Sequence, residues 1–338
     1  MSKQYVGHLP VHDPLHHYLQ YDILPQIGLD NCRAKFRVFR MGGSNEVYLY
    51  EEKHSNVQVV GKFFAGNGNG RFHIPEKYQR MEQEFHNLHL MRGYGLVEYP
   101  HYVVRPLGYN GWLSSLLVEE YCSGEPLSDI ITDAIRARQP GRLYSKLTSL
   151  AYFLATFHNR TANGYGVNFH EDCTYLDRLV RKLSKKQFIS WDEVQEFSWL
   201  RDRWREQPRM WEDQQVLVHG DATPSNFLFG QGLSVIGIDL ERMKRADRVF
   251  DIGRITGELQ HFFLQNTGNK YAAEPFIGHF LWEYACHFPD RDSAFRSICG
   301  RVPFQMGLTL LRIARNSWVS SDYRRRLIEE AKIILRTF

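Results

Sequence analysis

The texture of the sequence changes near residue 124, and this change limits the folds that the chain can adopt. Before this point, alternating, β-branched or aromatic residues predict strands. These predicted strands are 36–40, 46–50, 57–64, 102–107 and 116–121. One helix is predicted among them, over 76–92, where apolar residues recur at three- and four-residue spacing.

The pattern after Gly124 is mainly helical. The segment 143–158 places Leu147, Leu150, Leu154 and Phe157 on one face of a helix. We therefore expect an α+β, bilobal fold, with a small five-stranded β-rich N-lobe and a larger mainly helical C-lobe. The predicted divisions are an N-terminal extension at 1–30 in which prolines interrupt regular elements, an N-lobe at 31–121 and a C-lobe at 122–338.

Composition excludes several classes of protein. The chain has 338 residues, enough for two lobes, and no apolar run approaches the roughly 18 residues of a membrane helix. A net charge of +4 gives no reason to expect nucleic acid as a partner. The five cysteines are scattered without a CxxC pair, and Met1–Gln20 lacks the apolar core of a secretory signal. These features predict a cytoplasmic protein.

The most specific motif is a polar loop between two short apolar segments, 216–218 and 227–229. It contains His219, Asp221 and Asn226, and Asp239 follows Asn226 by thirteen residues, after a third apolar segment. Phosphoryl transfer needs such groups held rigidly. Asp221 would orient an acceptor hydroxyl and take its proton, while Asn226 and Asp239 would offer hard oxygen ligands to Mg²⁺. The alternative is that these are ordinary turn residues.

The N-terminal section supplies candidates for binding nucleotide. Gly42, Gly43 and Ser44 lie between two predicted strands, where backbone amides could approach phosphates, although Gly-Gly is also common in simple hairpin turns. Lys62 lies inside an apolar strand and could bind phosphates while pairing with a helix carboxylate. Glu84 is the preferred partner and Glu82 the rival. A lysine at a strand edge pointing to water is the alternative.

The strand 116–121 runs into the linker between the lobes. Backbone groups at this position could hold the edge of an adenine ring. The carbonyl of Glu120 and the amide of Cys122 are the candidates.

These motifs together resemble the aminoglycoside phosphotransferase and choline kinase group of the protein-kinase-like superfamily, over about residues 36–260. His219-Gly220-Asp221 through Asn226 is similar to that group's catalytic loop, and Ile238-Asp239-Leu240-Glu241 is similar to its metal motif. Phe250-Asp251-Ile252-Gly253 resembles the downstream stretch in which an Asp braces the catalytic loop. His219, Glu241 and Asp251 are therefore expected to support the site.

The resemblance implies a protein-kinase-like fold and transfer of the γ-phosphate of ATP, with Mg²⁺, to a hydroxyl of a small molecule. Glu119 stands where the group usually has an apolar residue beside adenine, which leaves GTP open as the nucleotide. A catalytically inactive nucleotide-binding scaffold and a divergent protein kinase are the alternatives. An inactive scaffold would usually lack at least one of the residues that the chemistry needs, and all of them are present: Lys62, Asp221, Asn226 and Asp239. A protein kinase should show an Ala-Pro-Glu signature after Asp239, and this signature is absent.

The sequence leaves the acceptor and the oligomeric state open. Residues 291–338 hold ten basic and four acidic side chains, including Arg312 and Arg315. A solvated helix face and attraction for an anionic acceptor are both consistent with this excess. Trp191, Trp199, Trp204 and Trp211 could form an aromatic cage for a quaternary ammonium group, or simply pack in the core.

Overall fold

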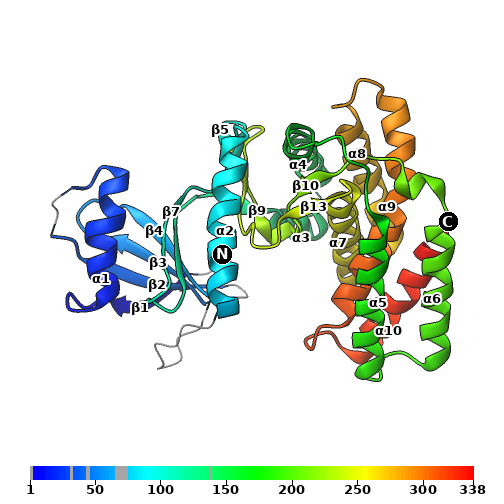
Figure 1. Ribbon diagram of the computed structural model, residues 1–338, viewed down its shortest axis with the longest axis horizontal. Coiled ribbons are helices and arrows are strands. Elements are labelled where there is room, and N and C mark those ends of the chain that lie inside the picture. The colour runs from blue at the N-terminus through cyan, green and yellow to red at the C-terminus, as the bar shows by residue number, and fades with distance from the viewer. Residues whose placement is uncertain (1–2, 31–32, 43–45, 65–74, 138) are drawn as a thin grey trace. The chain divides into compact units, whose positions relative to one another are not determined.

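The computed structural model describes residues 3–30, 33–42, 46–64, 75–137 and 139–338. It separates into two compact units (Figure 1). The first unit comprises Met1–Glu125 and Ile236–Arg242, and the second comprises Pro126–Val235 and Met243–Phe338. The chain therefore returns to the first unit for one short segment, which contains Asp239.

An antiparallel sheet of six strands forms the body of the first unit, in the order β1-β2-β3-β4-β8-β7. Its strands are β1 (Lys3–His8), β2 (Phe36–Met41), β3 (Glu46–Glu52), β4 (Gln58–Phe63), β7 (Pro106–Asn110) and β8 (Leu116–Glu120). Helix α2 (Pro75–Gly93) accompanies the sheet. The α+β fold class predicted from the sequence is confirmed, but the five-stranded sheet is wrong by one strand.

The extra strand comes from the N-terminal segment, where we expected no regular element. Lys3 to His8 pair with β2, and the Tyr5 ring packs 5.5 Å from the Phe39 ring, centroid to centroid. Helix α1 (Pro14–Tyr18) follows, capped by the Asp13 side chain. Because β1 is an edge strand with mostly exposed side chains, it lacks the alternation by which strands are recognised.

The predicted strand 102–107 is two strands. β6 (His101–Val103) pairs with β5 (Val97–Glu98), whereas β7 belongs to the six-stranded sheet. The backbone changes partners between them, and the Val104 N–H donates to the Gly237 carbonyl (3.1 Å). The apolar pattern over 102–107 is continuous, so it gave no sign that β6 and β7 belong to different sheets.

The second unit is mainly helical, as predicted. Its helices are α3 (Leu127–Ala137), α4 (Pro140–Arg160), α5 (Phe169–Lys185), α6 (Trp191–Arg205), α7 (Val249–Thr267), α8 (Glu274–Ala285), α9 (Arg291–Ala314) and α10 (Ser321–Leu335). Short strands are β10 (Val216–Val218), β11 (Phe227–Phe229) and β13 (Lys244–Ala246), with β9 (Glu125–Pro126) and β12 (Val235–Gly237) at the unit boundaries. β10 pairs with β13.

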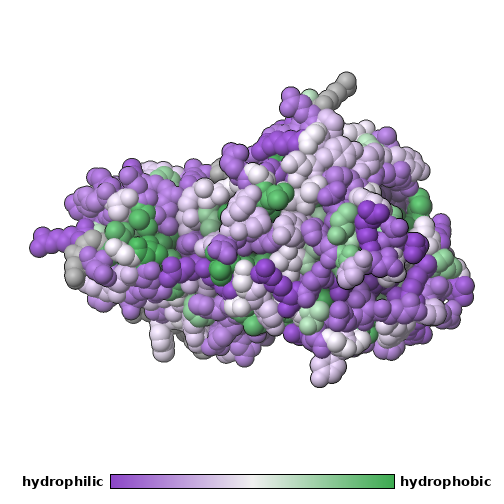
Figure 2. Space-filling view, turned by 90° about the horizontal axis from the view of Figure 1, so that it is seen from above, coloured by the Kyte–Doolittle hydropathy of each residue, from purple (hydrophilic) through white to green (hydrophobic). Residues whose placement is uncertain are grey.

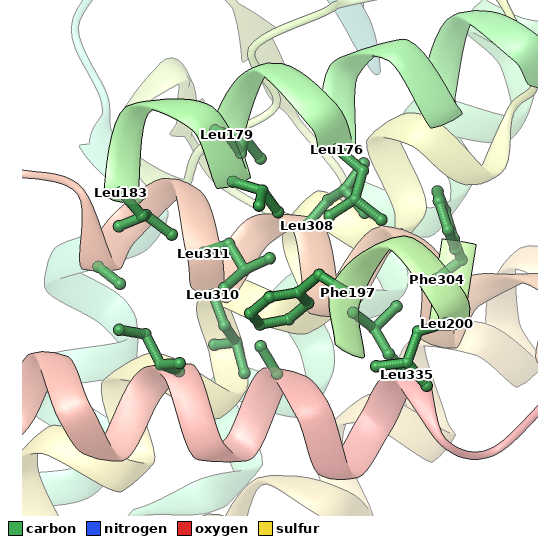
Figure 3. Close-up of a cluster of buried hydrophobic side chains, with 14 of the residues drawn as sticks. Leu176, Leu179, Leu183, Phe197, Leu200, Phe304, Leu308, Leu310, Leu311 and Leu335 are labelled. Carbon is green, nitrogen blue, oxygen red and sulfur yellow. The ribbon is translucent and has the colours of Figure 1, made fainter. Parts of the chain in front are cut away.

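Apolar side chains from α5, α6, α9 and α10 form a large core in the second unit (Figure 3). Leu176, Phe197, Leu308 and Leu335 are at most 1% exposed. Burying such side chains contributes about 1.5–3 kcal/mol each relative to leaving them exposed. This core fixes the position of α9, which carries Arg312.

Helix α7 packs closely against α9. A Cβ atom added at Gly253 would lie 2.2 Å from the Gln305 Cβ, and one at Gly257 would lie 2.7 Å from the Thr309 Cβ. The two glycines therefore permit an approach that a side chain would block. α7 is buried around most of its circumference, and its charged residues Arg254 and Glu258 are buried with it.

Figure 2 shows hydrophilic colours over most of one face, with hydrophobic residues in small separate groups. Among the residues that the structure describes, no helix combines the length and apolar character needed to cross a membrane.

We predict that Gly253→Ala destabilises the protein by about 1–3 kcal/mol or more, because the new methyl group overpacks the α7–α9 contact. Gly278→Ala is the matched control, since Gly278 is an exposed glycine in α8 with no atom within 4 Å of an added Cβ. This control should be neutral or stabilising by up to about 1 kcal/mol through helix propensity. Denaturant unfolding measures both, and equal effects would contradict the close contact.

Candidate active site

A buried lysine on β4 joins two carboxylates in the first unit. The Lys62 ammonium lies 2.9 and 2.7 Å from the two carboxylate oxygens of Glu84, and it also contacts Asp239 Oδ1. Glu84 comes from α2 and is fully buried. Of the two candidate partners, Glu84 thus makes the contact, whereas Glu82 lies 3.4 Å from the Tyr109 hydroxyl.

These contacts keep Lys62 charged. Burial alone would lower the pKa of Lys62, but Glu84 and Asp239 raise it above its ordinary value. Burial raises the pKa of Glu84, and the contact with Lys62 opposes that rise. Because a buried ammonium is costly without partners, the strand position of Lys62 is explained by this cluster and not by exposure to water.

The segment that carries Asp239 is tethered to α2. The Asn87 amide donates to the Leu240 carbonyl (2.7 Å), and the Arg80 guanidinium donates to Glu241 Oε2 (2.7 Å). Asp239 itself has φ of 64°, a left-handed conformation that non-glycine residues adopt rarely and often at functional sites. The surrounding contacts hold this conformation in place.

Three carboxylates gather at this point. One ligand atom each from Glu84, Asp239 and Glu241 lies within 4.8 Å of the others. Hard oxygen donors of this kind suit Mg²⁺. The predicted ligand Asp239 is part of the group, and Glu241, predicted as a supporting residue, belongs to it too. The other predicted ligand, Asn226, is in the second unit.

A further carboxylate is buried beside Lys62. Glu119 on β8 lies opposite Val60, two residues from Lys62 along β4 and so on the same face of the sheet. It is 7% exposed, and its Oε1 has no hydrogen-bond partner among the described residues. Burial raises the pKa of Glu119 to about 7, with Lys62 opposing the rise and Asp239 adding to it.

The remaining predicted nucleotide contacts lie around the same sheet. Glu120 ends β8, and its side chain accepts from the Tyr102 hydroxyl (2.5 Å). Cys122 follows in the linker as a free thiol, whose pKa burial raises to about 12. Gly42 directly follows β2, while Gly43 and Ser44 lie outside the described residues.

The polar loop after β10 is held by hydrogen bonds from its backbone to a buried carboxylate of α7. Asp251 accepts from the backbone N–H groups of His219 (2.6 Å) and Gly220 (3.1 Å). His158 Nε2 lies 3.2 Å from the same carboxylate, and its Nδ1 lies 2.8 Å from the Tyr284 hydroxyl. These contacts lower the pKa of Asp251 although burial alone would raise it. The bracing geometry expected of Asp251 is therefore present.

The loop also closes on itself. The Asn226 amide donates to the backbone carbonyl of Asp221 (2.9 Å), and Gly220 has φ of 78°, which favours glycine. The Asp221 side chain accepts from Arg312 Nη2 at 2.5 Å, while Arg312 Nη1 lies 3.4 Å from Glu258 Oε1. Sequence reasoning flagged Arg312 only as part of a basic region, and its contact with Asp221 was missed.

Three of the four tryptophans considered for a cage differ clearly in their environments. Trp204 is fully buried, and its indole N–H donates to the Leu335 carbonyl (2.8 Å). Trp191 and Trp199 are 72% and 53% exposed. The cage hypothesis requires that such rings surround one cavity, so this arrangement does not support it.

Comparison with known proteins places this geometry in context. The model of the phosphotransferase enzyme family matches residues 35–284, more than half of the chain. No curated protein matches by sequence. An ethanolamine kinase from Plasmodium vivax has a similar structure, with TM-score 0.61 and 12% identity, covering 94% of this chain and 87% of that one.

Two further solved structures share the fold. The choline kinase LicA from Streptococcus pneumoniae has TM-score 0.52 and 19% identity, covering 89% of this chain and 93% of that one. An ADP-bound aminoglycoside phosphotransferase, APH(2'')-Ib, has TM-score 0.55 and 11% identity, covering 96% and 97%. Because these identities are low, the structural likeness establishes the fold alone. The family model matches more than half of the sequence, so the chain belongs to the phosphotransferase enzyme family and is a kinase-type phosphotransferase.

Proposed function

We propose that this protein transfers the γ-phosphate of ATP to a hydroxyl group of a small molecule. The observation that carries the proposal is the braced loop, in which Asp251 fixes the backbone that presents Asp221. Catalysis of phosphoryl transfer is mostly positioning and electrostatics, so a rigid carboxylate is the group the reaction needs. The ADP-bound relative supports an adenine nucleotide as the donor.

The two units have separate tasks in this proposal. The first unit, with Lys62 paired to Glu84, would hold the nucleotide phosphates, and the backbone of Glu120 and Cys122 would meet the adenine edge. The sequence prediction divided the chain into an N-lobe at 31–121 and a C-lobe at 122–338, whereas in this proposal Asp239 acts with the first unit, which includes Ile236–Arg242. In the second unit, Asp221 would orient the acceptor hydroxyl and accept its proton.

Asp239 and Asn226 would hold Mg²⁺, and the neighbouring carboxylates of Glu84 and Glu241 fit a site with hard oxygen donors. When bound, the ion neutralises charge on the nucleotide phosphates. Lys62 contacts both Glu84 and Asp239, so it can align phosphate oxygens with the same carboxylates.

The Asp221 side chain is expected to affect turnover and not nucleotide binding. Asp221→Asn keeps the backbone carbonyl that Asn226 uses and removes only the charge and the proton acceptor. Its turnover with the best acceptor from a panel of hydroxyl compounds should fall by about 10²–10⁴-fold. Nucleotide affinity, measured by calorimetry, should stay within about twofold of wild type. A rate near wild type would mean that the loop is structural.

Asp239→Ala tests the metal site by binding. Wild-type protein should bind ATP more tightly with Mg²⁺ than with a chelator present, and the variant should lose this gain by at least about tenfold, since even outer partners of metal ligands contribute that much. For each protein, the ATP affinity measured with chelator is the reference for the affinity measured with Mg²⁺. An undiminished Mg²⁺ gain in the variant would remove Asp239 from the site.

Glu119 predicts a pH dependence of stability. Because its pKa is raised in the folded state to about 7, its contribution is fully present below the unfolded value near 4.5 and is lost as pH rises through about 7. Glu119→Gln, which mimics the neutral acid, should unfold at a similar free energy to wild type at pH 5. At pH 8 it should be more stable by on the order of 1–3 kcal/mol.

Denaturant unfolding of both proteins at the two pH values gives the comparison. Other buried acids, such as Asp172, titrate in both proteins and cancel in the difference. An equal difference at pH 5 and pH 8 would show that Glu119 stays ionised across this range.

A further inference from the structure

Three arginines of α7 and α9 belong to the charged group that includes the proposed catalytic carboxylate in the second unit. Arg312 contacts both Asp221 and Glu258, and its side chain is 16% exposed. Arg254, one helical turn before Glu258 on α7, is 4% exposed. Arg315 lies three residues after Arg312 at the end of α9, on the same side of the helix.

Arg254 is not satisfied by its surroundings. Its Nε and Nη1 atoms are buried and have no hydrogen-bond partner among the described residues. Buried guanidinium groups are almost always paired, because an unpaired buried charge is costly. Two unused donors on one buried arginine therefore indicate a place for an acceptor group that the described residues do not supply.

The side chain of Tyr175 reports the electrostatic field at this position. Burial alone would raise the pKa of the Tyr175 hydroxyl, but the charges of Arg254 and Arg312, a hydrogen bond from Arg254, and the charge of Arg315 lower it overall. Three guanidinium groups thus act on one hydroxyl. Burial and the charge of Arg254 also lower the pKa of Arg312, although Asp221 and Glu258 oppose this.

The charges in this group do not balance. Arg254, Arg312 and Arg315 carry three positive charges, whereas Asp221 and Glu258 carry two negative charges at most. Burial raises the pKa of Glu258, which reduces the negative charge that Glu258 contributes against the three arginines. The Arg315 side chain makes no ion pair within the described part of the chain. The cluster therefore has an excess of positive charge next to the group that would receive the acceptor.

We propose that the acceptor carries an oxyanion, a carboxylate or a phosphate, a few bonds from its reactive hydroxyl, and that Arg254, Arg312 and Arg315 bind this oxyanion beside Asp221. This inference rests on the proposed function and names its substrate class. Guanidinium groups match carboxylate and phosphate oxygens with paired N–H donors, which a neutral or cationic acceptor would leave unused.

The same contact gives Arg312 a role in selecting the acceptor. In the structure Arg312 donates to Oδ1 of Asp221, one of the two oxygens that could accept a proton. An incoming oxyanion competes with Asp221 for Arg312. In the transfer step, the acceptor oxygen forms a bond to the γ-phosphorus of ATP and the bond from that phosphorus to the β–γ bridging oxygen breaks. ADP leaves, and the hydroxyl proton passes to Asp221.

Binding of small probes tests the inference directly. With the nucleotide site saturated by ADP and ionic strength fixed, calorimetric titrations compare glycerol 3-phosphate and glycerate with glycerol and choline. The first two carry a hydroxyl and an oxyanion, and the last two carry a hydroxyl without one. We expect at least one oxyanion probe to bind at least about tenfold more tightly than glycerol and choline, the effect of a hydrogen bond to a charged group.

Two variants and a control locate the binding. Arg315→Gln removes a half-buried guanidinium that makes no ion pair among the described residues, and Arg254→Met removes the buried one. Each should weaken the oxyanion probe by about tenfold or more. Arg296→Gln is the matched control, an exposed arginine on the same helix as Arg312, and should bind as wild type does. Should Arg254→Met fail to fold, Arg315→Gln still decides the outcome.

The possible outcomes distinguish a failure of this inference from a failure of the proposed function. Oxyanion binding that falls in Arg315→Gln supports the site even if no acceptor is phosphorylated, a result that would count against the proposed function alone. Phosphorylation of glycerol or choline in preference to the oxyanion probes would overturn the inference and leave the proposed function standing. Absence of oxyanion binding, or equal binding in all variants, would also overturn it.

Discussion

The close contact of α7 with α9 is the constraint on which the functional part of the second unit depends. Gly253 and Gly257 let the two helices approach more closely than any side chain would allow. The same turn of α7 carries Asp251, whose carboxylate holds the loop amides of His219 and Gly220. A shift of α7 would therefore move the loop that carries Asp221, so packing and the proposed chemistry are coupled through one helix.

This coupling explains why so many charges are buried along α7. A helix that is covered on most sides must satisfy each charged group internally, at a desolvation cost of several kcal/mol per ion. Asp251 meets this requirement with two amides and His158. Arg254 does not, since two of its donors lack partners among the described residues. Buried charged groups that lack internal partners are expected mainly at functional sites, where a ligand supplies the missing hydrogen-bond partners.

Local sequence patterns predicted those features that local physics determines. The spacing of Asp221, Asn226 and Asp239 singled out a loop that closes on itself and an aspartate that lies in a group of three carboxylates. The apolar periodicity of α4 predicted residues that are all buried. Patterns failed where the cause lay elsewhere in the fold. β1 is recognisable only from its pairing with β2, and Arg312 meets Asp221 across 91 residues of sequence. Charge counting indicated a basic region but could not identify its partner.

In the proposed function, chemistry and acceptor choice are set by different parts of this chain. The residues of the loop follow a spacing that phosphoryl transfer itself requires, so they say little about the acceptor. The side chains around Asp221 come instead from α7 and α9, elements that are free to differ while the loop is kept. An arginine in contact with Asp221 changes what can approach that carboxylate, because a cationic acceptor meets repulsion and an anionic one meets a guanidinium partner. Acceptor specificity in this protein is therefore best sought in the charges on these two helices.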